Sequence, residues 1–314
     1  MFSSPSSASR PGKMAIKPYL QLVRLPNVFT AAADSLAGWL LVGGALSDAR
    51  HWLPLAFSSM AIYAAGIALN DVFDYEVDRL ERPGRPLPSG RVSRRFAWWL
   101  GATLLAAGPL VALASGSLTS AAVAALLAGC VLAYDAGAKR TWLGPSVMGA
   151  CRGLNVLLGM SQAPALGGPT AWLVAGSMSV FVMGVTWISR GETGFGRTRG
   201  LYVGMVLENL AILGLVGAAL RPRDFPSPAI DRPILNLEGL LVLLVVAWLV
   251  ALAGSRAIRE PRPEHFQKAV KTGVLSLVWL NCGVVAAVRG VEPGLAIAAF
   301  WVPAYVLGRW IYST

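Results

Sequence analysis

The sequence predicts an all-α protein, a multi-span bundle of transmembrane helices. Of the 314 residues, 55% are apolar and only 14% are charged, and the mean hydropathy is +0.58. Several apolar runs reach the roughly 20 residues that a helix needs to cross a bilayer. The net charge of +11 comes from basic residues in short loops between these runs, which is typical of membrane topology and anionic headgroups rather than of nucleic-acid binding.

The N-terminal region differs from the rest of the chain. Residues 1–13 are rich in Ser, Pro and basic residues and contain no apolar core, so we expect a disordered cytoplasmic tail rather than a secretion signal. Residues 14–25 fit a short amphipathic helix on the membrane surface. We expect residues 14–314 to form a single membrane-embedded domain.

Ten apolar segments follow, and basic residues separate them asymmetrically. If the N-terminus is cytoplasmic, 21 Lys and Arg residues lie on the cytoplasmic side and five on the other, with Arg152 inside a segment. This asymmetry favours ten spans with both termini in the cytoplasm. The segments are 28–46, 52–72, 96–114, 118–134, 143–165, 171–189, 200–220, 235–253, 272–288 and 293–310.

The second segment runs into a cluster of acids at the cytoplasmic face. Asn70, Asp74 and Asp78 are spaced i, i+4, i+8, which predicts one amide and two carboxylates along a single helical face. Like charges at this spacing repel unless a cation compensates them. Mg²⁺ favours a few carboxylates together with phosphate oxygens and water. Arginines follow at once, and guanidinium groups suit phosphate recognition. The alternative is a solvated helix end with a basic loop after it.

Residues 70–78 followed by residues 82–90 carry a family resemblance. They read N-D-V-F-D-Y-E-V-D and then R-P-G-R-P-L-P-S-G, which resembles the first aspartate-rich motif of the UbiA superfamily of intramembrane prenyltransferases, together with its tail. The resemblance implies a helical membrane enzyme, typically of nine spans, that binds an isoprenyl diphosphate through Mg²⁺. It implies Asp74 and Asp78 as catalytic metal ligands with Asn70, and Asp71, Arg82 and Arg85 as further diphosphate-binding residues.

Two other basic positions resemble elements of the same family. Tyr134 and Lys139 resemble its Y-x-x-x-x-K element, whose lysine contacts diphosphate, although a Lys-Arg pair is also an ordinary membrane anchor. Arg24 before Pro26 resembles the entry to the first helix, where it would reach either phosphate or a lipid headgroup. We favour a catalytic role for Lys139.

Arg152 and Asn155 lie within one turn inside the segment 143–165. A charge at that depth is costly and normally faces the interior of a bundle. Arg152 therefore either lines a cavity or pairs with an acid such as Asp34 or Glu208, and we favour the pairing.

The end of the sixth segment departs from the family pattern. A second aspartate-rich motif is expected there, but residues 187–197 read W-I-S-R-G-E-T-G-F-G-R with Glu192 as the only acid. Glu192 is a candidate metal ligand or a partner for Arg190 or Arg197, and these two arginines are candidates to neutralise diphosphate. The Ser-Arg-Gly-Glu stretch resembles the divergent EboC-like branch of the superfamily.

These features predict Mg²⁺-dependent transfer of a prenyl group from an allylic diphosphate to a lipophilic acceptor, aromatic or other, within the membrane. The predicted location is a bacterial inner membrane or its equivalent, with the active site facing the cytoplasm. The degenerate second motif keeps two alternatives open: a transporter or lipid-binding protein that reuses the fold, and a component that helps to assemble an enzyme complex.

Overall fold

The computed structural model describes residues 16–190, 197–225 and 235–312. Within them every regular element is helical and no strand occurs. The α-helices are α1 (Lys17–Leu22), α2 (Leu25–Leu41), α3 (Ala49–Phe73), α4 (Tyr75–Glu81), α5 (Arg94–Leu113), α6 (Leu118–Ala136), α7 (Gly144–Met160), α8 (Gly168–Arg190), α9 (Arg197–Ala219), α10 (Leu237–Arg259), α11 (Pro263–Arg289), α12 (Val291–Ala298) and α13 (Trp301–Tyr312). Three short 3₁₀ turns are η1 (Ala138–Arg140), η2 (Pro164–Gly167) and η3 (Pro222–Asp224).

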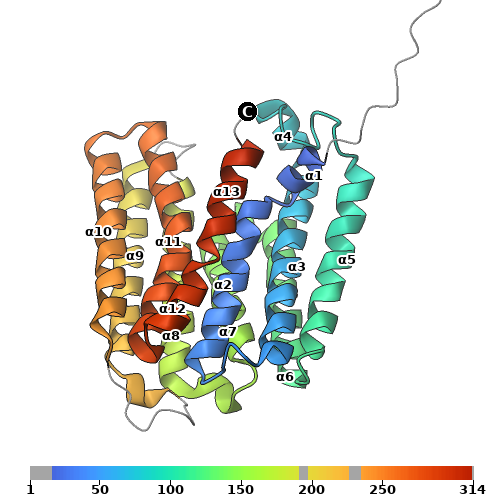
Figure 1. The fold of residues 1–314 in the computed structure, drawn as a ribbon. Helices are drawn as coiled ribbons and strands as arrows, with labels where there is room; N and C mark the ends of the chain where they lie inside the picture. The colour runs from blue at the N-terminus through green and yellow to red at the C-terminus, as the bar shows by residue number, and fades with distance from the viewer. Residues whose placement is uncertain (1–15, 191–196, 226–234, 313–314) are drawn as a thin grey trace, which may run out of the picture.

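The long helices lie side by side in one bundle (Figure 1). Helices α3, α5 and α6 lie at one side of the bundle, and α9 and α10 lie at the other. Helix α2 packs against α3, α7, α11 and α13, so it is central to the bundle. The chain's N-terminal helix α1, the short helix α4 and the C-terminus share one end of the molecule.

Large apolar side chains cover the outside of the bundle. Leu110, Leu213 and Trp248 are each more than 60% exposed, on α5, α9 and α10. Eight helical stretches of the described residues are long and apolar enough to cross a membrane. The protein is therefore a multi-pass integral membrane protein, and these outward residues are placed to contact lipid.

Each of the ten predicted segments contains a helix, but several boundaries were wrong. Helix α2 ends at Leu41 rather than near residue 46, and α7 ends at Met160 rather than near residue 165. Both have 17 residues. The predicted surface helix is only six residues long in the described part, α1. The tenth segment is divided into α12 and α13.

The boundary error is largest at the ninth segment. Helix α11 begins at Pro263, nine residues earlier than expected, and α10 extends to Arg259. The stretch between the eighth and ninth predicted segments is thus mostly helical, with a tight turn at residues 260–262. Phe266 and Ala269 are buried there against Ile188 of α8 and Leu201 of α9. This packing stabilises the first turns of α11, which precede the apolar segment predicted from the sequence.

Helices α2 and α7 approach each other more closely than ordinary side chains would allow. A Cβ at Gly159 would overlap the carbonyl oxygen of Ser35, and one at Gly38 would overlap that of Val156. Small residues at such a crossing are a common device for packing helices in membranes. The close approach fixes the position of Arg152 and Asn155 relative to α2.

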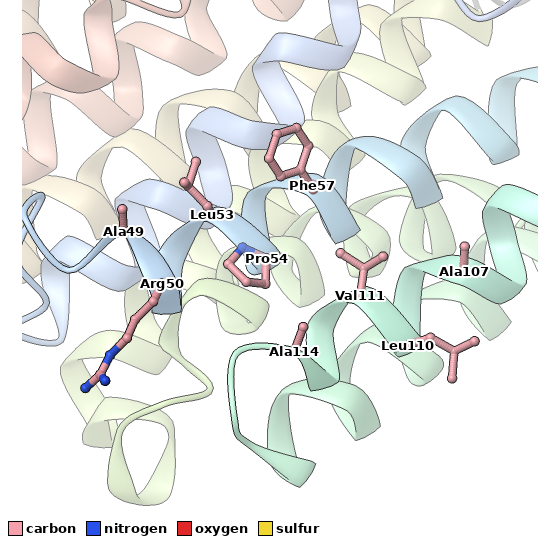
Figure 2. A pocket seen from close by; sticks show the side chains of 9 residues that line it. All are labelled: Ala49, Arg50, Leu53, Pro54, Phe57, Ala107, Leu110, Val111 and Ala114. Carbon is pink, nitrogen blue, oxygen red and sulfur yellow. The ribbon is translucent and has the colours of Figure 1, made fainter.

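A shallow apolar groove of about 640 Å³ lies between the start of α3 and the end of α5. Figure 2 shows Leu53, Pro54 and Phe57 on one side of it and Leu110 and Val111 on the other. It lies at the opposite end of the bundle from α4, so it is separate from the acidic motif.

Candidate functional site

The acidic motif lies at a kink between two helices. Helix α3 ends at Phe73, Asp74 has a backbone conformation of φ −93°, ψ 5°, and α4 begins at Tyr75. The motif was expected on one straight helical face. That expectation was wrong, because the structure divides its polar side chains into two pairs, each gathered around a different cation.

The first pair is Asn70 and Asp74. Lys139 Nζ donates to Asn70 Oδ1 at 2.8 Å and lies 2.8 Å from Asp74 Oδ1. Lys139 comes from η1, the turn between α6 and α7, and its side chain is only 11% exposed. Arg140 also approaches Asp74, at 3.6 Å, but its side chain is 65% exposed.

The second pair is Asp71 and Asp78, both buried. Arg85 Nη1 lies 2.5 Å from Asp78 Oδ2 and 3.4 Å from Asp71 Oδ1. Arg24 Nη2 lies 3.6 Å from the same Asp71 oxygen. These contacts bring together the predicted first-helix arginine, the first motif and its arginine tail.

Arg24 reaches this position through an unusual backbone. It has φ 45° and ψ 52°, a left-handed conformation that costs an ordinary residue ~1–2 kcal/mol. The turn separates α1 from α2, and Pro26 in the first turn of α2 suits the start of a helix. It leaves the Arg24 side chain at the cavity described below.

The arginine tail folds into a compact loop. Arg91 donates to Gly84 O at 2.5 Å and to Ser89 Oγ at 2.9 Å, and Leu87 is buried against Leu22 and Val72. This packing holds Arg85 over the carboxylates. Arg82, predicted to bind diphosphate, is exposed, and its side chain makes no hydrogen bond or ion pair with any residue that the structure describes.

Arg190, at the end of α8, contacts the turn that carries Lys139. Its Nη2 donates to the carbonyl oxygens of Lys139 and Thr141, both at 2.7 Å. In this arrangement Arg190 positions the turn rather than facing the acids. Glu192 lies outside the described residues, and of Arg197 only its place at the start of α9 is described.

A cavity of about 410 Å³ extends from the motif into the bundle. Its motif end includes Arg24, Asn70 and Tyr134, and its deep end reaches Ser59 and Asn155. Asn70 is eleven residues beyond Ser59 on the same helix, which corresponds to a depth of ~16 Å. Between these ends the walls are mostly apolar: Ile62, Ile67, Leu127, Val131, Met148, Val182, Val185, Val274 and Leu277.

A buried polar network closes the deep end. Arg152 Nε lies 2.6 Å from Asp34 Oδ2, which confirms the predicted pairing with an acid and selects Asp34 over Glu208. Asp34 also accepts from Asn155 at 2.9 Å and from Asn281 at 2.6 Å. These contacts link α2, α7 and α11. Arg152 and Asn155 also line the cavity, so the network forms the polar floor of a mostly apolar chamber.

Sequence reasoning missed an acid in the cavity, Asp135. It follows Tyr134 near the end of α6, is 4% exposed and lines the cavity. The signal was an acid at the edge of an apolar segment, which is rare in membrane helices and usually functional.

The oxygen atoms of the motif fit a Mg²⁺ ion that is held partly by the protein and partly by a phosphate group. Among the described residues, no three His, Cys, Asp or Glu side chains converge closely enough to hold a metal by themselves. The motif instead offers carboxylate and amide oxygens in pairs, next to cations suited to phosphate. Mg²⁺ commonly uses one or two carboxylates and completes its shell with phosphate oxygens and water.

Comparison with known families agrees with this geometry. Residues 32–197, more than half of the chain, match the model of the UbiA prenyltransferase family. The chain belongs to the UbiA prenyltransferase family. The matched range contains the motif, the Lys139 turn and three members of the polar network, Asp34, Arg152 and Asn155.

Curated relatives match over part of their length. A digeranylgeranylglyceryl phosphate synthase of Ignicoccus hospitalis is 41% identical over 128 residues, which are 41% of each chain. The synthase of Methanococcoides burtonii is 34% identical over 154 residues, covering 46% of this chain and 54% of the relative. The chain thus matches about two fifths to a half of the length of these relatives.

Solved structures share the fold across most of the chain. A structure described as digeranylgeranylglyceryl phosphate synthase aligns with a TM-score of 0.62 at 22% identity, covering 88% of this chain and 99% of that one. A UbiA homologue from Aeropyrum pernix gives a TM-score of 0.58 at 20% identity, covering 83% and 97%. The UbiA homologue from Archaeoglobus fulgidus bound to DMAPP and Mg²⁺ gives 0.51 at 16% identity, covering 92% and 98%.

Proposed function

We propose that this protein transfers a prenyl group from an allylic prenyl diphosphate to a lipophilic acceptor inside the membrane. The observation that carries the proposal is the meeting of Asp71, Asp74 and Asp78 with three basic side chains at the end of an apolar cavity. A diphosphate needs the charged end, and a prenyl chain needs the apolar walls.

The basic residues supply the charge that a leaving diphosphate requires. Lys139 and Arg85 are partly buried and already held by the motif acids, so they are oriented before the substrate arrives. Cations fixed in a water-poor site stabilise developing negative charge without reorganising. Arg24 lines the same cavity and adds a third cation, while Arg190 positions the turn of Lys139. Tyr134 lines the cavity beside them.

We infer that Mg²⁺ is the cofactor and that Asp74 and Asp78, with Asn70 and Asp71, supply its protein oxygens. When bound, the ion would neutralise the diphosphate and promote its departure. The contacts of these residues with Lys139 and Arg85 hold the oxygens apart in two pairs. This arrangement suits an ion whose remaining ligands are the oxygens of the diphosphate. Glu192 remains a candidate ligand, and Arg82 and Arg197 remain candidates to bind the diphosphate.

For the acceptor, the relatives suggest a first compound to test. Their name denotes a glyceryl phosphate that carries two geranylgeranyl groups, so geranylgeranylglyceryl phosphate is the natural probe acceptor. The Ser-Arg-Gly-Glu sequence of the divergent branch leaves room for another lipophilic acceptor. The charge asymmetry favours a cytoplasmic location of the motif, in the inner membrane of a bacterium or an equivalent membrane.

The proposal is tested by incubating the purified protein in nanodiscs with radiolabelled geranylgeranyl diphosphate, Mg²⁺ and geranylgeranylglyceryl phosphate. We expect a labelled lipid product that requires Mg²⁺ and is absent with Asp78→Asn. Binding of the diphosphate without any product, for this acceptor or for a membrane lipid extract, would instead favour a lipid-binding protein or transporter that reuses the fold.

A further inference from the structure

Asp135 is a buried acid in the cavity whose role the diphosphate site does not explain. It lies on α6, one residue before that helix ends, and is 4% exposed. Its Oδ2 lies 4.0 Å from the position that a Cβ would occupy at Gly66. Gly66 and Asp135 both line the cavity, so the carboxylate faces the chamber where α3 and α6 adjoin.

The Oδ2 atom of Asp135 has no hydrogen-bond partner in the part of the chain that the structure describes. The cations of the site are already occupied, because Lys139 bonds Asn70 and Asp74, and Arg85 bonds Asp71 and Asp78. A buried polar atom without a partner costs free energy. The position therefore lacks a hydrogen-bond donor that a ligand would bring.

The two substrates differ in whether they can supply that donor. An ionised carboxylate only accepts hydrogen bonds, and a diphosphate also presents acceptor oxygens and negative charge, so the two repel. An acceptor with a hydroxyl group has the hydrogen that Asp135 lacks. Resting on the proposed function, we propose that Asp135 binds the acceptor's hydroxyl group and receives its proton, so that the acceptor is a lipid alcohol or phenol.

The step balances with the atoms present. The C1–O bond of the prenyl donor breaks, and its electron pair leaves with the diphosphate. A lone pair of the acceptor oxygen forms the new C–O bond to C1. The hydroxyl proton passes to the carboxylate of Asp135 and then to water at the motif end of the cavity, giving an ether, a diphosphate and a proton.

Binding measurements on the full chain in nanodiscs test the role on the acceptor side. The cavity is first filled with Mg²⁺ and the unreactive thiolo analogue of geranylgeranyl diphosphate. The affinity for geranylgeranylglyceryl phosphate is then compared with that for its deoxy analogue, in which hydrogen replaces the free hydroxyl. We expect the wild type to prefer the alcohol at least tenfold, and Asp135→Ala to bind both within about threefold of each other.

Turnover separates proton transfer from simple binding. In Asp135→Asn, transfer to the alcohol should fall at least ~100-fold, while the affinity for the Mg²⁺-bound donor analogue stays within about twofold. Glu208→Gln is the matched control. Glu208 on α9 is also buried and has an unpartnered oxygen, but it faces Gly184 and Gly273 rather than the cavity, so this variant should keep the preference for the alcohol.

Three outcomes would overturn the assignment. In the first, the wild type binds the alcohol and its deoxy analogue equally well, or binds neither. In the second, Asp135→Asn transfers the prenyl group at the normal rate. In the third, Asp135→Ala loses as much affinity for the donor analogue as it loses transfer activity. Failure of the proposed function itself would look different, because the wild type would then form no Mg²⁺-dependent transfer product with any acceptor, whether or not it binds the donor analogue.

Discussion

Lys139 and Asp74 lie 2.8 Å apart, although 65 residues separate them in the chain. The contact joins the turn after α6 to the kink between α3 and α4. It places a largely buried cation beside the acid expected to meet a diphosphate, and Arg190 holds that turn from a third helix. Helices from three parts of the chain thus build one charged end of the cavity.

The first prediction concerns Lys139. Replacing it by Met keeps the length of the side chain but removes the charge, so kcat/KM for the prenyl diphosphate should fall ~10²–10³-fold, as when one fixed donor is lost from an oxyanion site. The measurement is a rate series over diphosphate concentration. Arg140→Gln is the matched control: Arg140 also approaches Asp74 but is mostly exposed, and exposed pairs contribute only ~0–1 kcal/mol. Similar losses in both variants would contradict a special role for Lys139.

A second prediction concerns the ion pair between Arg152 and Asp34. Arg152→Met leaves Asp34 charged and buried, so the free energy of unfolding should fall by about 3–5 kcal/mol. The double variant Arg152→Met with Asp34→Leu removes both charges and should recover part of that loss. Unfolding in detergent, followed by circular dichroism, measures both. If the double variant is no more stable than Arg152→Met, the buried charge is not the cause.

The third prediction uses the close contact of α2 and α7. Gly159→Ala should destabilise the bundle by at least ~1–3 kcal/mol, because its Cβ would overlap a carbonyl oxygen of α2 and overpacking strains a rigid core. Gly129→Ala on α6 is the control, since nothing lies within 4 Å of its Cβ position. There the change should be neutral or stabilising by up to ~1 kcal/mol, from helix propensity. Equal melting temperatures for the two variants would show that the contact is looser than described.

The fourth prediction is topological. Gly84→Cys, in the arginine tail with open space around it, should react with an impermeant maleimide only from the cytoplasmic side of oriented vesicles. Arg221→Cys, in the exposed loop just after α9, should react only from the other side. Labelling of both from one side would mean that the number of crossings between them is even.

Much of this arrangement could be predicted from the sequence. Apolar runs and loop charges predicted the helices, because a bilayer demands about 20 apolar residues and basic loops set orientation. The pairing of Arg152 with a buried acid followed from the cost of a charge at that depth, although the sequence left Asp34 and Glu208 as alternative partners. The end of α2 and the start of α11 were wrong because they depend on packing between helices, which hydropathy does not contain.

The details of the site lay beyond the sequence for the same reason. The spacing of Asn70, Asp74 and Asp78 predicted one face, but contacts with Lys139 and Arg85 from distant segments draw the side chains into two pairs. Arg190 was expected at the diphosphate, yet its partners are two carbonyl oxygens of a turn. The surroundings of Asp135, a cavity whose cations already have partners, likewise depend on how the helices pack.

Binding of a prenyl diphosphate by the acidic motif is the central claim, and isothermal titration with Asp74→Asn tests it most directly. Glu76→Gln is the matched control, because Glu76 lies in the neighbouring helix α4 with its side chain 68% exposed and paired with the exposed Arg79. The wild type and Glu76→Gln should bind geranylgeranyl diphosphate with the same affinity, dependent on Mg²⁺, and Asp74→Asn should lose that binding. Unchanged Mg²⁺-dependent affinity in Asp74→Asn would contradict the account.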